Sequence, residues 1–150
     1  MVLSDNMKII FSFIFILFSF KSVQSQDRFE NLDVFELQYA RDPQISPDGN
    51  YILYVRTEMD IMKDGRSSSI WILNADGSNH QKLTSSTRNE SNPRWSPDSE
   101  KISFISSSDD DNGSEIFIYW VDSRQYSSIS QLSGSPRSIK WSRNGKYLGF

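Results

Sequence analysis

The sequence predicts an all-β fold, a partial β-propeller with two four-stranded blades and the start of a third. One observation is a repeat: SPDGNYILYV at residues 46–55 returns as SPDSEKISFI at 96–105, 50 residues later (96 − 46), and SRNGKYLGF at 142–150 is a shorter echo. The other is the alternation of short β-branched and aromatic runs with clusters of Ser, Asn, Asp, Gly and Pro. Repeats of about 40 to 50 residues with four short strands each are typical of propeller blades. A plain β-sandwich has no reason to repeat the same turn, aromatic strand and Leu-Thr ending in one order.

Ten short strands are expected after residue 43, and no later segment has the periodicity of a helix. Each unit is expected to open at a proline: Pro43, Pro93 or Pro136. The strands are expected near 44–46, 51–57, 69–74 and 81–84 in the first unit, near 94–96, 101–106, 115–121 and 128–132 in the second, and from 138 and from 146 in the third.

The repeated Ser-Pro-Asp-Gly stretch has the chemistry of a tight turn. Serine can cap the turn with its hydroxyl, proline fixes φ near −65° at the first corner, and Asp-Gly suits the second corner. The second copy has Ser99 in place of glycine, and the third has Arg143 in place of proline. Both replacements are expected to weaken the turn without changing its type.

The first 25 residues predict a secretory signal peptide. Lys8 precedes the apolar run Ile9–Phe20, whose twelve residues are too few to span a bilayer, which needs about 20. Val23 and Ser25 then place small residues where a signal peptidase cleaves, so cleavage after Ser25 is expected, with export to the periplasm or the extracellular space. A buried core helix and an uncleaved anchor are the alternatives.

Composition excludes several classes of function. The 150-residue chain has a formal net charge of −3, which does not indicate nucleic-acid binding. It has no cysteine, so it has neither disulfides nor a thiolate metal site, and its stability must come from a packed core. No cofactor is expected.

The domain organisation follows from these patterns. The stretch NLDVFELQYA at 31–40 suits a short helix or an extended lead-in equally well, and a short helix is expected. The expected segments are a signal peptide at 1–25, a lead-in at 26–42, and an incomplete propeller at 43–150 with blades at about 43–90, 91–135 and 136–150.

No catalytic, cofactor-binding or metal-binding residue is expected in this chain. Gly65–Ser69 resembles the G-x-S-x-G nucleophile elbow but fails at its fifth position, so it is interpreted as a loop between strands. His80 stands in a polar hairpin without a partner serine or cysteine. Asp109–Gly113 does not match the spacing of an EF-hand loop and is interpreted as a solvated turn, since its fifth residue is glycine and the twelfth, Trp120, is not an acid.

The blade unit, Ser-Pro-Asp-Gly followed by an apolar strand and a Leu-Thr ending, is similar to the repeat of TolB-like, WD40-like propellers. The lead-in at 32–37, running into 42–56, resembles the start of the propeller in exported serine peptidases of the prolyl oligopeptidase family, within it the acylaminoacyl-peptidase and dipeptidyl-peptidase branch. The resemblance covers about residues 32–150 and contains no catalytic chemistry.

This resemblance implies a hydrolase that cleaves short peptides, in which the propeller gates access to a following α/β-hydrolase domain. The serine, aspartate and histidine of that domain have no counterpart here, and the adjacent glutamates that hold a substrate amino terminus in some members are missing. A non-enzymatic TolB-like binding module of the cell envelope is the alternative, although such proteins usually carry an α/β domain before the propeller.

Two blades and part of a third cannot close a ring, since propellers have about 4 to 8 blades. The chain is therefore expected to be the amino-terminal part of a longer protein. By itself it is expected to be inactive, and its unpaired sheet edge favours aggregation.

Overall fold

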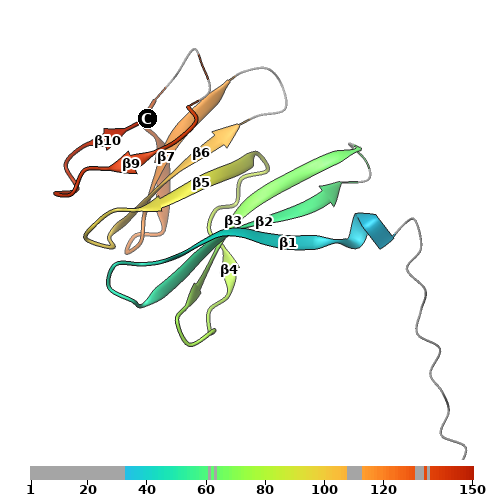
Figure 1. Ribbon diagram of the computed structural model, residues 1–150, viewed down its shortest axis with the longest axis horizontal. Coiled ribbons are helices and arrows are strands. Elements are labelled where there is room, and N and C mark those ends of the chain that lie inside the picture. Colours follow the sequence, from blue (N-terminus) through green and yellow to red (C-terminus); the bar gives the residue numbers. More distant parts are fainter. Residues whose placement is uncertain (1–32, 61, 63, 108–112, 131–133, 135) are drawn as a thin grey trace, which may run out of the picture. The chain divides into compact units, whose positions relative to one another are not determined.

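In the computed structural model the described residues are 33–60, 62, 64–107, 113–130, 134 and 136–150 (Figure 1). The chain divides into two compact units, Met1–Glu30 and Asn31–Phe150, and every described residue lies in the second. The predicted signal peptide and most of the acidic run at 109–113 fall outside the described residues. Within the described ranges, no helix is long and apolar enough to cross a membrane.

Two four-stranded antiparallel sheets and one pair of strands form the second unit (Figure 1). In each four-stranded sheet the strands are neighbours in sequence order, so each sheet is a meander of hairpins. We call the three sheets the first, second and third blade. The first contains β1 (Gln38–Ile45), β2 (Tyr51–Asp60), β3 (Gly65–Asn74) and β4 (Gln81–Lys82); the second contains β5 (Asn89–Trp95), β6 (Lys101–Ser107), β7 (Ser114–Trp120) and β8 (Gln125–Ser128); the third contains β9 (Lys140–Trp141) and β10 (Leu148–Gly149).

The helix expected at 31–40 is wrong for most of its length. A 3-10 helix, η1 (Asp33–Glu36), occupies one turn, and β1 begins at Gln38, before the expected start of the first blade. Gln38 and Ala40 pair with Glu58 and Arg56 of β2. Pairing with a distant strand therefore outweighs the local helical spacing.

Two further boundaries differ from the expectation. Gly65–Ser69, interpreted as a loop, is the first half of β3, because Ser67 and Ser69 pair with Glu58 and Arg56 across a long hairpin. Strand β8 ends at Ser128, the residue at which this strand was expected to begin. The turn after Trp120 is short, so β8 already pairs with β7 from Gln125 onward.

The three repeated turns share one hydrogen-bond network. In the first turn, Gly49 N donates to the carbonyl of Ser46 at 2.9 Å, and Tyr51 N donates to Ser46 Oγ at 2.9 Å. The Ser46 hydroxyl donates to Asp48, which also accepts from Asn50 N at 3.1 Å. The same network starts at the serines of the other two blades, with Ser99 keeping the left-handed φ of the glycine that it replaces, at 62°. The turn type is therefore unchanged, as expected.

Bulges interrupt the first strands of the two complete blades at matching positions. The register of β1 shifts at Asp42 and Pro43, and that of β5 shifts at Asn92 and Pro93. Asp42 and Asn92 both have positive φ, 50° and 54°, which short polar side chains tolerate better than most. Counted back from the turn serine of the third blade, the residue equivalent to Pro93 is Ile139. The expected alignment of Pro136 is therefore displaced by three residues.

A continuous apolar core joins the first and second blades. Leu53, Val55 and Ile70 of the first blade pack in one buried cluster with Ile102 and Phe104 of the second. A smaller cluster of Ile105, Ile116 and Ile139 joins the second blade to the segment before β9. Strand β6 of the second blade therefore buries side chains on both of its faces, whereas β2 and β3 bury mainly one face.

The two complete blades differ in length at one hairpin. Val55 pairs with Ile70, a separation of 15 residues (70 − 55), whereas the equivalent Ile105 pairs with Ile116, a separation of 11 (116 − 105). The turn serines are 50 residues apart in the first interval and 46 in the second (142 − 96). The hairpin between the second and third strands of a blade thus accounts for the whole difference of four residues.

Candidate functional site

The first strands of the three blades, β1, β5 and β9, contact one another in sequence order (Figure 1). Three side chains donate hydrogen bonds to backbone carbonyl groups of a neighbouring first-strand segment. Gln44 Nε2 donates to the carbonyl of Pro93 at 2.8 Å, Asn92 Nδ2 to that of Arg137 at 3.2 Å, and Trp141 Nε1 to that of Arg94 at 3.1 Å. These bonds fix the spacing of the three strands.

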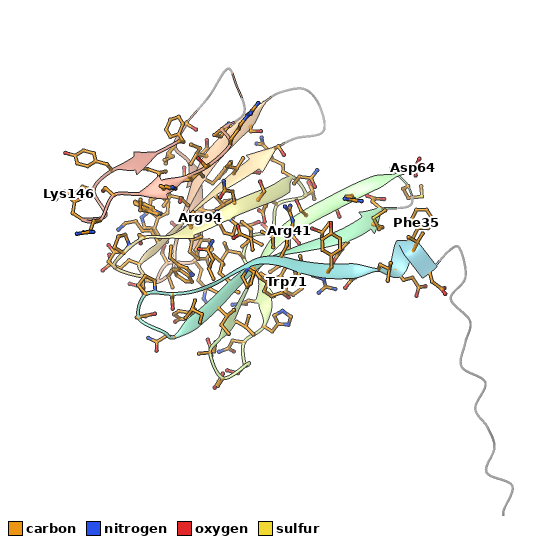
Figure 2. The ribbon with its side chains drawn as sticks, in the orientation of Figure 1. Phe35, Arg41, Asp64, Trp71, Arg94 and Lys146 are labelled. Carbon is orange, nitrogen blue, oxygen red and sulfur yellow. The ribbon has the colours of Figure 1, made fainter. Side chains whose placement is uncertain are left out.

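A polar hollow of about 400 Å³ opens beside these strands. Its walls come from the first and second blades and from the segment before β9, and it extends to Ser107 and Ser114, where β6 ends and β7 begins. Figure 2 labels two of its arginines, Arg41 on β1 and Arg94 on β5. The polar residues of the first-strand segments that line it are Arg41, Asp42, Ser91, Asn92, Arg94 and Arg137.

The described residues that line the hollow carry more positive than negative charge. Arg94 forms an ion pair with Asp42 at 2.8 Å and donates to the carbonyl of Pro93 at 2.6 Å. Arg41 donates from Nε to Thr57 Oγ1 at 3.2 Å. Among the described residues, neither Arg41 nor Arg137 has an ion pair. Among the described lining residues, the one carboxylate is thus paired with one arginine, and two guanidinium groups remain.

His80, the single histidine, lies away from the hollow, exposed beside the first blade. Its Nε2 is 2.7 Å from the hydroxyl of Tyr54, and its ring packs 4.9 Å from that of Trp71. The guanidinium carbon of Arg56 lies 4.7 Å from the centroid of the Trp71 ring. In this position His80 contacts aromatic rings, and none of these contacts is with a serine.

Glu90 is a buried carboxylate that the sequence did not single out. It lies on β5 with 0% exposure and reaches the first blade, where Oε2 accepts from Ile70 N at 3.0 Å and Oε1 accepts from the hydroxyl of Thr84. Burial raises the pKa of this carboxyl, and the two hydrogen bonds oppose that shift. Since both oxygens bind groups of the edge of the first blade, the role of Glu90 is structural.

The described residues contain no group of three or more histidine and acidic side chains suited to a metal ion. Gly65–Ser69, now part of β3, has its serines paired against β2. Ser68 donates to the carbonyl of Glu90 at 2.9 Å, so its hydroxyl links two blades.

Sequence reasoning missed the arginine-lined hollow, although a signal for it exists. Arg41 and Arg137 both stand five residues before a turn serine, Ser46 or Ser142. Arg94 stands two residues before the turn serine of the second blade, Ser96. Comparing these offsets between blades would have placed the three side chains on neighbouring strands.

The sequence is similar to those of two peptidases. No family model matches the sequence. The chain is 26% identical over 116 residues to the uncharacterized peptidase YuxL of Bacillus subtilis, a match that covers 77% of this chain and 18% of that protein. It is 23% identical over 104 residues to dipeptidyl-peptidase 5 of Porphyromonas endodontalis, covering 69% and 15%. The chain therefore spans less than a fifth of the length of either relative.

Solved structures show the same arrangement of sheets. Pyrococcus horikoshii acylaminoacyl peptidase matches with a TM-score of 0.66 and 24% identity, over 81% of this chain and 18% of that one. The β-propeller domain of the Trilobed protease from Pyrococcus furiosus matches with a TM-score of 0.62 and 24% identity, over 75% and 33%.

This chain is a partial β-propeller. The fold class expected from the repeat is confirmed, and so is the resemblance to peptidase propellers, since both curated relatives are peptidases. The partial propeller also matches TolB from Acinetobacter baumannii, with a TM-score of 0.57 and 21% identity over 74% of this chain and 26% of that one. The blades alone therefore do not distinguish the two kinds of protein.

Proposed function

We propose that this chain is the amino-terminal propeller part of an exported serine peptidase of the prolyl oligopeptidase family. The observation that carries the proposal is the pair of peptidase relatives, each matched over more than two thirds of this chain but over less than a fifth of its own length. Most of each relative therefore lies outside the matched region. In this proposal an α/β-hydrolase domain follows the propeller in the same protein.

The propeller acts as a filter for short peptides. Its sheets are held together by the buried core between blades and by the hydrogen bonds of Gln44, Asn92 and Trp141, and in the longer protein further blades would complete the ring that excludes large substrates. In the hydrolase domain a serine attacks the peptide carbonyl, a histidine accepts its proton, and backbone N–H groups stabilise the oxyanion. The described residues of this chain supply position and access to that reaction and take no part in the bond-breaking step.

Export is part of the proposal. Lys8, the apolar run Ile9–Phe20 and the small residues before position 26 support a cleaved signal peptide. Expressing the full chain with a carboxy-terminal tag and sequencing the amino terminus of the exported product tests this step. A new amino terminus at Gln26 is expected. An intact amino terminus on membrane-bound protein contradicts it.

The catalytic part is tested by sequencing the transcript beyond the codon for Phe150 and expressing the resulting product. The expected reading frame continues through further blades to a G-x-S-x-G motif followed by aspartate and histidine. Its product is expected to react covalently with a fluorophosphonate probe and to cleave short peptides. The 150-residue chain, as the control, is expected not to react. A stop codon directly after residue 150 in the expressed transcript contradicts the proposal.

The similarity to TolB supports a second candidate, a cell-envelope binding module without catalysis. In that case the reading frame ends after the last blade, with no nucleophile elbow, and the product leaves the fluorophosphonate probe unreacted. The two curated relatives favour the peptidase, because both are peptidases.

A further inference from the structure

We infer that the hollow beside the first strands binds the carboxy-terminal carboxylate of a short peptide. This inference rests on the proposed peptidase function and names the end of the substrate that the propeller holds. No residue of the hollow is needed for the bond-breaking step, so the hollow acts in positioning and selection.

The charge of the hollow is opposite to that of the whole chain. The chain has a formal net charge of −3, whereas the described residues that line the hollow include three arginines and one carboxylate, Asp42. Because Asp42 is paired with Arg94 at 2.8 Å, its charge is already balanced. The remaining attraction for an anion comes from Arg41 and Arg137, which stand on different blades.

The arginine on β1 is held in place by a buried group. Thr57 has 3% exposure, and its hydroxyl accepts from Arg41 Nε at 3.2 Å. This bond uses one donor and leaves the two terminal NH₂ groups of the guanidinium for a ligand. A guanidinium with a fixed orientation loses less entropy on binding and can grip a carboxylate through two parallel hydrogen bonds.

The backbone on the opposite wall is also fixed. Asn92 donates from Nδ2 to the carbonyl of Arg137 at 3.2 Å, and Trp141 donates to the carbonyl of Arg94 at 3.1 Å. These bonds hold the segment before β9 against β5. Arg41 and Arg137, which have no ion pair with another described residue, therefore come from segments with defined spacing, β1 on one side and the segment before β9 on the other.

The size and walls of the hollow suit a peptide end. Its volume of about 400 Å³ lies in the usual range for ligand sites, about 300 to 1,000 Å³. Strands β1 and β5 each pair with a neighbour on one side, so each has a second edge that faces away from its sheet. An extended peptide can bind such an edge through its main chain. Inorganic phosphate shares the oxyanion chemistry but has no main chain, so it should bind more weakly.

The experiment compares a peptide acid with its amide. Titration calorimetry at low ionic strength would measure binding of N-acetyl-trialanine, of its carboxy-terminal amide and of inorganic phosphate to the full chain. The acid is expected to bind at least tenfold more tightly than the amide or phosphate, and added salt should weaken it. Absence of measurable binding of the acid, equal binding of acid and amide, or tighter binding of phosphate would overturn the inference.

Variants locate the site. Arg41→Gln and Arg137→Gln are each expected to weaken binding of the acid about tenfold, since hydrogen bonds to charged groups are the stronger ones. Arg143→Gln is the matched control: it removes the same charge from an exposed position on the third turn and should change binding less than twofold. Arg41→Lys keeps the charge but loses the planar fork and should lie between. Circular dichroism of each variant confirms that the blades are intact, and equal effects of the hollow and control variants contradict the site.

The outcome separates this inference from the proposed function. If the longer product reacts with the fluorophosphonate probe but cleaves peptide acids and amides with equal kcat/KM, the peptidase stands and the hollow has no role in selection. If the acid binds through Arg41 and Arg137 but the reading frame contains no catalytic serine, the carboxylate site stands and the peptidase does not.

Discussion

The two complete blades present the same sheet face to different surroundings. Phe104 and Phe117 of the second blade are paired across β6 and β7 with ring centres 5.5 Å apart, and Phe104 has 1% exposure because the first blade covers it. The equivalent pair in the first blade is Tyr54 and Trp71, which are half-buried.

The difference between the pairs is chemical as well as positional. The Tyr54 hydroxyl bonds to His80, and Trp71 lies under the guanidinium of Arg56, so both rings have polar partners on the side away from the second blade. The alternating pattern of a strand therefore decides which residues share a face. The neighbouring blade decides how deeply that face is buried.

The largest expected effect comes from truncating the two equivalent aromatic residues. Phe104→Ala should lower the free energy of unfolding by about 3 to 5 kcal/mol, because it leaves a cavity in the core between blades. Tyr54→Ala should lower it by about 1 kcal/mol, since a partly exposed site loses less. Urea unfolding of the full chain followed by circular dichroism measures both. Equal losses would mean that a partner covers the Tyr54 face in solution.

The next effect concerns one backbone N–H group in the third strand of each blade, for which the two blades provide different hydrogen-bond acceptors. Ile70 N donates to Glu90 Oε2 at 3.0 Å, whereas the equivalent Ile116 N donates to Ser130 Oγ at 3.0 Å. Glu90→Ala should cost about 3 kcal/mol, from a buried unpaired N–H and a cavity. Ser130→Ala should cost about 1 kcal/mol in the same unfolding measurement. A smaller loss for Glu90→Ala than for Ser130→Ala would contradict this account.

The carboxylate of Glu90 also makes the stability of the folded chain depend on pH. Burial raises the pKa of Glu90 above its ordinary value of 4.5, so the folded state holds its proton more tightly than the unfolded state does. As the pH rises from about 4.5 through the folded pKa, the stability of the native chain should fall relative to that of Glu90→Gln, which keeps an acceptor for Ile70 N. Hydrogen bonds lower the pKa of Asp98 in both proteins, so its effect at acid pH cancels in the difference. A flat difference between pH 4 and 8 would show that Glu90 is not shifted.

The smallest effect is at the turn of the second blade. Ser99 has a φ of 62°, and its hydroxyl accepts from Asp48 N at 3.1 Å, a bond between blades that Gly49 has no side chain to make. Ser99→Ala loses this bond and keeps the backbone strain, so it should cost about 1 kcal/mol. Ser99→Gly loses the bond but relieves the strain, and the two should cancel to within about 0.5 kcal/mol. Thermal unfolding of the three proteins side by side measures the order, and a larger loss for Gly than for Ala would contradict it.

Much of the fold could be predicted from local chemistry. Each strand expected in the two complete blades overlaps an observed one, because the alternating runs and the serine turns are both short-range signals. The errors lie where a distant partner decides the conformation. Gln38–Ala40 are strand because β2 runs past them, and Gly65–Ser69 are strand because a hairpin longer than expected pairs them with β2.

The candidate site was less predictable than the fold. Arg41 and Arg137 are 96 residues apart in sequence (137 − 41), and no local pattern marks either as functional. They meet at one hollow because each first strand begins a blade and blades stack in order. Glu90 escaped notice for the same reason: a lone glutamate in a polar stretch resembles a surface residue until the edge of the neighbouring blade is known.

Ser107 and Ser114, the pair of residues that flanks the shorter hairpin of the second blade, line the wall of the hollow. Residues can therefore be added or removed there while the turn network and the core between blades keep their register. If the hollow binds peptide ends as we infer, the length of this hairpin is a means of tuning selectivity. Shortening or lengthening it would then change which peptide ends fit beside the arginines and leave the turn network and the core unchanged.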